Sequence, residues 1–384
     1  NLVPEFENDT LEYTIDVPAS VAVSSWDSVN NRVVLNVLAV QGDATYTLRV
    51  SAVCKQGTTY ADKSINITDS NVIMDSNSNP EVLAICYQQG WCANSDKMTL
   101  QEAAAVVDIG TAFQNKSNIK HFEELQYFTT ITSIAYSAFS GCYQLTSIVI
   151  PANITSLGMR AFSGCNNLES IVFLGTSLTC DEYIFSGCSK LLTAGPIEGG
   201  YNIEYGFTGT FPAYFFKFTS NRSYITSIII PEGITTIGNS AIYNCNKLSY
   251  LRLPSSLTSC SNSGLLSNSP LLLTAGPIGG GYNIEFGFTT VIPNNAFKGS
   301  NITSIVFPEG VTSIGNYAFS STSLQSIMIT NGVTRIGEGA FSVCSNLASV
   351  VIPDSVTTIG SSAFSQCPLL LTAGPIEGGY NIEY

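Results

Sequence analysis

Any catalytic chemistry in this chain would have to start from a single histidine. His121 lies beside Glu123 and Glu124 in the segment NIKHFEEL, where an imidazole could act as a general base or bind a metal ion. A paired-histidine metal site would need a second subunit, and the carboxylates show no recurring pair. We therefore expect a structural role for His121, and neither enzymatic activity nor a cofactor.

A second candidate for chemistry is a segment that partly matches the sequence pattern of a calcium-binding EF-hand loop. In residues 92–103, Asn94 and Asp96 occupy positions 3 and 5 of an EF-hand pattern. Lys97 replaces the glycine that position 6 needs, and Glu102 comes one residue too early for position 12. The segment is better explained as a loop between two helices.

The cysteines are the third candidate, and their spacing argues against a disulfide framework. Six of the eleven recur at the same place in a repeated block: Cys142, Cys165, Cys188, Cys245, Cys344 and Cys367. In the block that starts at Leu248, Asn268 takes that place. The pattern predicts a ladder of interior thiols, with Cys180 and Cys260 as core residues of another position. Cys86 and Cys92 could either form a disulfide or remain thiols.

The repeated block itself is the strongest signal in the sequence. Units of about 23 residues start at Leu145, Leu168, Ile225, Leu248, Ile302, Leu324 and Leu347, with the skeleton L-x-x-I-x-I-P-x-x-V-T-x-I-G-x-x-A-F-x-x-C. Such a period predicts a solenoid with one long strand per coil, stacked into parallel ladders, and a phenylalanine in a turn that fills the core. We assign residues 131–384 to this solenoid.

Three units carry about eight extra residues at one corner, in the variants LLTAGPIEGGYNIEYGF, LLTAGPIGGGYNIEFGF and LLTAGPIEGGYNIEY. Tyr201 and Tyr282 in these insertions could stack on pyranose rings. Alternation instead places Tyr201, Ile203 and Tyr205 on one inward face of a strand, which favours burial. The third copy stops at Tyr384, which predicts a truncated chain or an end closed by partner contacts.

The long strands also predict an outward row of mostly apolar side chains on the solvent face. This row comprises Val149, Val172, Ile229, Arg252, Val306, Met328 and Val351. An apolar row on a solvent face is typical of a protein-docking surface. The alternative is that β-branched residues simply suit strands.

The N-terminal third differs from the solenoid. Residues 1–70 contain short strand-like runs separated by glycine-rich turns, and the segment ATYTLRVSA resembles the late strands of immunoglobulin-like modules, so we expect an immunoglobulin-like β-sandwich. Residues 71–130 contain Asn79-Pro80 and a capping box at Thr99, each a helix start, followed by the degenerate repeat DIGTAF. We expect a helical cap over the end of the solenoid.

Composition limits the partners. The net charge of −13 would repel a phosphate backbone, so we expect no nucleic acid partner. No apolar stretch approaches the roughly 20 residues that a transmembrane helix requires.

The repeat skeleton, seen in VTSIGNYAF, VTRIGEGAF and VTTIGSSAF, resembles the Treponema-type leucine-rich repeat family, also called BspA-like. The resemblance implies export to a bacterial cell surface and adhesion to a host or neighbouring-cell protein, and it implies no catalytic motif. Two alternatives stay open: a glycan-binding protein of a gut or oral bacterium, and a passive structural spacer.

Overall fold

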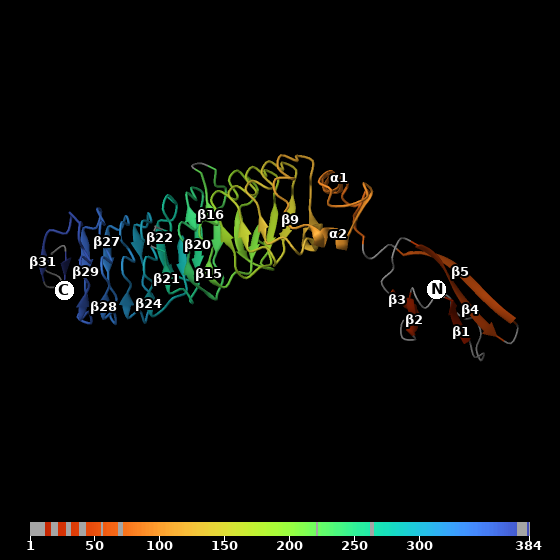
Figure 1. The fold of residues 1–384 in the computed structure, drawn as a ribbon. Coiled ribbons are helices and arrows are strands. Elements are labelled where there is room, and N and C mark those ends of the chain that lie inside the picture. Colours follow the sequence, from red (N-terminus) through yellow and green to blue (C-terminus); the bar gives the residue numbers. More distant parts are fainter. Residues whose placement is uncertain are drawn as a thin grey trace. The chain divides into compact units, whose positions relative to one another are not determined.

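The computed structural model describes the side chains of residues 72–219, 222–261 and 265–372, together with the backbone of strands outside these ranges. The chain divides into two compact units, Asn1–Ala105 and Val106–Tyr384. Figure 1 shows both units as ribbons.

The first unit begins with five antiparallel strands. They are β1 (Glu12–Asp16), β2 (Ala22–Asp27), β3 (Arg32–Val37), β4 (Ala44–Cys54) and β5 (Gly57–Ile67). They form a three-stranded sheet in the order β1-β4-β5 and a β2–β3 pair. The immunoglobulin-like packing predicted for residues 1–70 depends on side chains outside the described residues, and it stays a prediction.

The second part of this unit confirms the two predicted helix starts. Strand β6 (Val72–Asp75) pairs with β7 (Lys97–Thr99), and the two helices are α1 (Pro80–Gln88) and α2 (Leu100–Ala105). Helix α1 starts with Pro80 after the N-cap Asn79. At α2 the Thr99 backbone N–H donates to Glu102 Oε2 at 2.8 Å, and the Glu102 N–H donates to Thr99 Oγ1 at 3.3 Å, as a capping box requires. The role of this segment as a cap stays a prediction.

The second unit is a parallel-strand solenoid, as the repeat predicted. After the short 3₁₀ helix η1 (Glu123–Tyr127), its long strands form a nine-stranded parallel sheet in the order β25-β22-β23-β20-β17-β13-β14-β11-β9. These strands are β9 (Ser147–Ile150), β11 (Ser170–Phe173), β13 (Thr193–Pro196), β14 (Ile203–Tyr205), β17 (Ser227–Ile229), β20 (Tyr250–Leu253), β22 (Thr274–Pro277), β23 (Ile284–Phe286) and β25 (Ser304–Ile305). A further parallel sheet continues with β27 (Ser326–Met328), β29 (Ser349–Val351), β32 (Ile382–Glu383) and β31 (Ala373–Gly374).

Shorter strands form separate parallel ladders along the solenoid (Figure 1). One ladder contains β8 (Ser133–Ile134), β10 (Ser156–Leu157) and β12 (Thr179–Cys180), and another contains β15 (Gly209–Phe211), β18 (Ile234–Ile237) and β21 (Ser259–Cys260). A third contains β24 (Val291–Ile292), β26 (Ser313–Ile314), β28 (Arg335–Ile336) and β30 (Thr358–Ile359), and β16 (Phe216–Lys217) pairs with β19 (Ile242–Tyr243). The pairing of Leu157 with Cys180 confirms the register predicted for that cysteine, but Cys180 is only half-buried. The core position is confirmed for Cys260, which is 4 % exposed.

Two columns of phenylalanine rings run through the interior, as predicted from the A-F pair of each unit, and the coils between them carry the buried Ile242 and Leu266 at the same position. Phe297, Phe319 and Phe341 are fully buried and stack in parallel at centroid distances of 5.2 Å, with interplanar angles of 5°. Each ring therefore fills the space between two coils rather than within one, which is why a single unit has no core of its own.

The predicted cysteine ladder lies beside these rings. The Cys165 thiol donates to the Phe139 carbonyl oxygen of the preceding coil at 3.1 Å, and Cys142, Cys188, Cys344 and Cys367 make the same 3.1 Å contact with their preceding coils. One residue of the prediction is wrong. Ser269, 1 % exposed, takes the ladder place in the coil assigned to Asn268, and Asn268 is exposed.

Candidate binding surface of the solenoid

The predicted outward row lies on the solvent face of the long strands. Val149 pairs with Val172, and Ile229 pairs with Arg252, with their inward neighbours buried. Val306 and Met328 are the most open members, 47 % and 72 % exposed, and the others are half-buried. Met328 and Val351 lie in the second sheet, so the row spans two sheets and not one.

The insertions change this face in a way that the sequence did not predict. The extra residues of the first copy form β14, which lies between β13 and β11 although it follows β13 in the chain. Strand β23 has the same place between β22 and β20. The insertions therefore add strands to the sheet instead of enlarging a corner. They also add residues to the outward row, because Glu204 pairs with Val172 and Glu285 pairs with Arg252.

The loop between β13 and β14 lies on the solvent face. Ile203, Tyr205 and Phe207 are buried, as the alternation predicted. The prediction that Tyr201 shares their inward face is wrong, because Tyr201 precedes β14 and its half-buried ring packs against the outward side of Gly195. A Cβ atom at Gly195 would lie 2.4 Å from Tyr201 Cε2, so only glycine fits beneath the ring. Tyr282 packs against Gly276 in the same way.

Side-chain hydrogen bonds hold each loop in this position. The Glu204 carboxylate accepts from the backbone N–H groups of Glu198, Gly200 and Tyr201 at 2.8–3.1 Å. Asn202 Oδ1 accepts from the Thr193 hydroxyl at 3.1 Å, and Asn283 Oδ1 accepts from Thr274 at the same distance. The polar groups of the insertions are thus used within the loops and in contacts with the neighbouring coil, where Asn202 Nδ2 donates to the Glu169 carbonyl oxygen and Asn283 Nδ2 donates to that of Ser249.

The two described loops separate three patches of the outward row. We name them the proximal patch (Val149 and Val172), the central patch (Ser227, Ile229, Tyr250 and Arg252) and the distal patch (Val306, Met328 and Val351). The central patch is polar at one edge, where the Tyr250 hydroxyl donates to Glu285 Oε2 at 3.0 Å. The named residues of the distal patch are all apolar, and they are flanked by the outward serines Ser304, Ser326 and Ser349.

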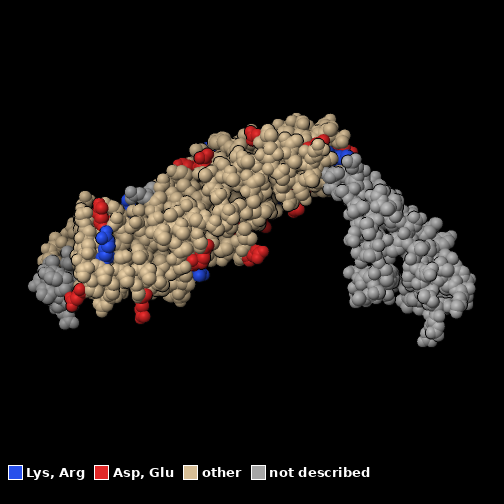
Figure 2. Space-filling view, turned by 60° about the horizontal axis from the view of Figure 1, so that its bottom comes forward, with Lys and Arg blue, Asp and Glu red and all other residues tan. Residues whose placement is uncertain are grey.

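Electrostatics differ between these patches. Burial raises the pKa of Glu285, but hydrogen bonds from Gly279, Tyr250 and Gly281 and the charge of Arg252 together lower it, so this carboxylate is ionised at neutral pH. Desolvation and the hydrogen bond to Glu285 raise the pKa of Tyr250, so its hydroxyl remains a donor. On the face drawn in Figure 2, most of the solenoid surface is uncharged.

Comparison with known proteins assigns the repeat. The BspA-type leucine-rich repeat region matches six copies over residues 92–206, 209–272 and 283–376. The chain belongs to the BspA-type leucine-rich repeat family. No match was found among curated proteins.

Solved structures provide further similar chains. A leucine-rich repeat protein from Bacteroides ovatus is 19 % identical, with 99 % of each chain covered and a TM-score of 0.41. A leucine-rich cell surface protein from Faecalibacterium prausnitzii is 19 % identical over 66 % of this chain and 83 % of its own, with a TM-score of 0.26. The pneumococcal vaccine antigen PcpA is 15 % identical over 70 % of this chain and 67 % of its own, with a TM-score of 0.31.

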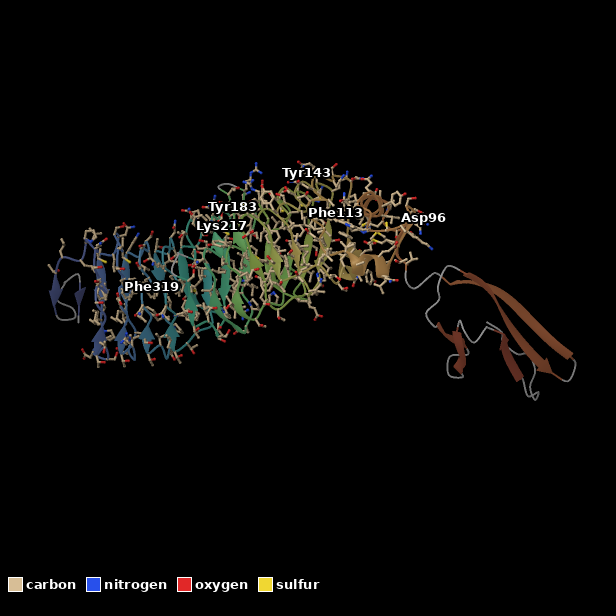
Figure 3. All side chains as sticks on the ribbon, in the orientation of Figure 1. Asp96, Phe113, Tyr143, Tyr183, Lys217 and Phe319 are labelled. Carbon is tan, nitrogen blue, oxygen red and sulfur yellow. The ribbon has the colours of Figure 1, made fainter. Side chains whose placement is uncertain are left out.

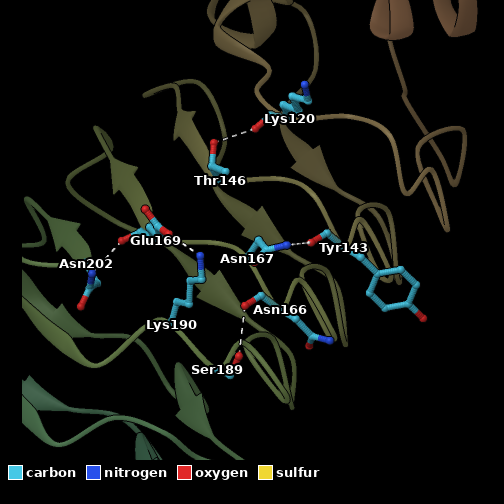
Figure 4. Close-up of polar contacts among 9 residues, drawn as sticks. All are labelled: Lys120, Tyr143, Thr146, Asn166, Asn167, Glu169, Ser189, Lys190 and Asn202. Carbon is cyan, nitrogen blue, oxygen red and sulfur yellow. Dashed lines mark hydrogen bonds and ion pairs between the residues drawn. The ribbon is translucent and has the colours of Figure 1, made fainter.

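One edge of the BspA-type solenoid is held by polar contacts between neighbouring coils (Figure 4). Thr146 Oγ1 donates to the Lys120 carbonyl oxygen at 2.9 Å, and Asn202 Nδ2 donates to the Glu169 carbonyl oxygen at 2.7 Å. The Lys190 ammonium pairs with the Glu169 carboxylate, and both side chains are about half exposed. An ion pair this exposed contributes little to stability, so the edge is held mainly by its hydrogen bonds.

The candidates for catalysis and metal binding take structural positions. His121 bridges Ser147 through its backbone and extends the long-strand ladder by one position. Glu102 accepts from the Ala93 N–H at 2.8 Å as well as from the capping box. Among the described residues, no group of three or more His, Cys, Asp or Glu side chains is placed to hold a metal ion. In the same part of the chain, no helix is long and apolar enough to cross a bilayer.

The described cysteines are thiols, and both Cys86 and Cys92 are buried. Desolvation raises the pKa of the Cys142 and Cys188 thiols to about 12. A thiol with so high a pKa is a poor nucleophile at neutral pH, so these two thiols serve packing and not chemistry.

Proposed function

We propose that this protein is a non-enzymatic adhesion or protein-binding protein of a bacterial cell surface, and that it binds its partner through the outward face of the long strands. Membership of the BspA-type family supports the general role. The observation that carries the choice of surface is the distal patch, where Val306 and Met328 are 47 % and 72 % exposed beside Val351.

An apolar row in this position is suited to protein recognition for two reasons. Burial of a large apolar side chain contributes about 1.5–3 kcal/mol, so covering Met328 and Val306 would provide a substantial part of a micromolar affinity. Methionine also adapts its shape to a partner, because its side chain is unbranched and flexible. The proposed partner is a host or neighbouring-cell surface protein.

The test is binding of the whole chain to arrays of extracellular matrix proteins and mucins, with Val306→Asp and Met328→Asp as variants. Each charge placed in a buried apolar contact is expected to raise Kd by at least about tenfold, which corresponds to about 1.4 kcal/mol. Val291→Asp is the matched control, because Val291 is 46 % exposed but lies in β24, outside the long strands. Binding that survives both face variants, or no binding by the unaltered chain, would reject the proposal.

A glycan site built on Tyr201 and Tyr282 has less support. Each ring packs against two glycines of its own insertion, Gly195 and Gly199 or Gly276 and Gly280, so part of each ring is already in contact. The hypothesis of a passive spacer gives no reason for the exposure of Met328. It predicts that the Met328→Asp variant shows no change in binding.

A further inference from the structure

A second surface lies in the turns that precede the buried phenylalanines. In the described coils, the residue before the buried pair of this turn has a positive φ. In five coils it is small: Ser137, Ser240, Asn295, Gly339 and Ser362. One later coil carries a lone bulky residue there, Tyr317. Three successive coils instead carry Arg160, Tyr183 and Tyr214, with φ of 59°, 63° and 60°. Bulky L-residues rarely adopt this conformation because the Cβ atom approaches the backbone too closely.

Burial does not compensate for this strain. Arg160 is exposed, and Tyr183 and Tyr214 are only half-buried. Smaller residues serve the same turn in five other described coils, so the fold itself does not demand large side chains here, and only these three coils carry them in succession. A strained backbone at a bulky residue, where a smaller residue would avoid the strain, is typical of a recognition site.

Lys217 fixes the positions of these rings. Its Nζ lies 5.0 Å from the centroid of the Tyr214 ring, 5.7 Å from that of Tyr183 and 5.6 Å from that of Tyr243, and it also forms an ion pair with Glu182. Tyr243 and Lys217 are paired across β16 and β19. Figure 3 shows Tyr183 and Lys217 next to one another. The lysine thus lies against three aromatic rings and a carboxylate, and these contacts hold the rings in place. We call Tyr183, Tyr214 and Tyr243 together with Lys217 the aromatic platform.

The chemistry around the rings indicates the kind of ligand. Lys217 forms an ion pair with Glu182, so its charge is compensated at the aromatic platform, and Arg160 lies near enough to Tyr183 to act on its hydroxyl. Tyr183, Tyr214 and Tyr243 are only half-buried, so the face that each ring turns away from Lys217 can stack on the C–H face of a pyranose ring, while the charged groups bind neighbouring hydroxyls. Adjacent coils are about 4.8 Å apart, close to the length of one sugar unit. A protein interface would instead have a core depleted of charged residues.

We propose that Tyr183, Tyr214 and Tyr243, held by Lys217, form a binding site for a chain of neutral pyranose sugars, with Arg160 and Glu182 at its edge as hydrogen-bonding groups. The site is separate from the outward row of the long strands. It does not depend on the function proposed for that face.

The strain provides a sharp test, because glycine suits a positive φ. Tyr183→Gly and Tyr214→Gly remove the rings and relieve the backbone, so the melting temperature is expected to remain within about 4 °C of the unaltered chain. Isothermal titration with cellohexaose, chitohexaose, maltohexaose and xylohexaose measures binding. At least one sugar is expected to bind the unaltered chain, and each variant is expected to weaken it by about tenfold or more.

Tyr317→Gly is the matched control. Tyr317 also has a positive φ, carries Lys298 5.3 Å above its ring and donates to Glu338, but it is a single ring. Its loss is expected to leave sugar binding unchanged, as is Met328→Asp on the other surface. The proposal is overturned if none of the four sugars binds at millimolar concentration, if binding survives both glycine variants, or if these variants abolish binding of a protein partner and not of a sugar.

Discussion

The ring of Tyr201 packs so closely on Gly195 that a single methyl group at position 195 would collide with Cε2 at 2.4 Å. This contact explains the glycine in the TAGPI motif. It also explains how a loop can lie on the solvent face of a sheet without a pocket beneath it. The outward row is therefore divided by loops that the protein itself provides.

Gly195→Ala is expected to destabilise the solenoid by about 1–3 kcal/mol, because the added methyl group overpacks the contact with the ring. Urea unfolding of the purified chain measures the change. Gly175→Ala is the control, since a Cβ there would meet its neighbours at an ordinary 3.6 Å. The double variant Gly195→Ala/Tyr201→Ala is expected to recover most of the loss, and no recovery would show that the ring is not the cause.

The repeat predicted the fold well because its signals are local and recur in every unit. The alternation of Ile148 and Ile150 with Val149 defines the two faces of a strand, and the spacing of the cysteines defines a ladder. Because each pattern recurs in successive units, it predicts how the strands of neighbouring coils are aligned. The misplaced Asn268 shows the limit, because a missing cysteine left the register of that coil open by one residue.

The insertions were predicted less well because their arrangement depends on long-range order. The alternation correctly predicted that Tyr205 is buried. No local pattern shows that β14 lies between β13 and the earlier strand β11 in the sheet. The aromatic platform was also missed. Its signal was present in the register, since Tyr183 and Tyr214 both directly precede the buried pair of their coils, Ile184-Phe185 and Phe215-Phe216.

Phe319→Ala is expected to cost about 3–5 kcal/mol, because it opens a cavity between two stacked rings in a fully buried column. Phe364→Ala should cost less, since Phe364 is half-buried and stacks on Phe341 at 5.3 Å. Chemical denaturation of both variants compares the two costs. Equal losses would contradict the view that the column acts as the continuous core.

Stability is expected to fall as the pH rises above 9. The pKa of Cys142, Cys188 and Cys260 is about 12 in the folded chain and about 9 when the thiol is solvated, so the unfolded chain releases protons first. Each thiol then lowers the free energy of unfolding by about 1.4 kcal/mol at pH 10. The contribution is intact below pH 9 and is lost progressively towards pH 12.

Cys142→Ser checks this pH dependence, because a hydroxyl can keep the hydrogen bond to the Phe113 carbonyl oxygen but does not ionise in this range. Denaturant unfolding at pH 8 and pH 10 measures the drop in the free energy of unfolding between the two pH values. This drop should be smaller in the variant by the contribution of one thiol, about 1.4 kcal/mol. An identical pH effect in both chains would show that Cys142 ionises equally in the folded and unfolded states.

Asn202→Ala is expected to loosen the first insertion. Its side chain accepts from the backbone N–H groups of Leu192 and Thr193 and donates to the Glu169 carbonyl oxygen, so its removal leaves several polar groups of neighbouring coils without partners. Hydrogen exchange of the Leu192 and Thr193 amides should accelerate while the Phe319 region is unchanged. Asn167→Ala is the control, because Asn167 donates a single exposed bond to the Tyr143 carbonyl oxygen. If the Leu192 and Thr193 amides exchange at the same rate in both variants, the Tyr201 ring and the Glu204 carboxylate are sufficient to hold the loop, and the Asn202 hydrogen bonds are not required.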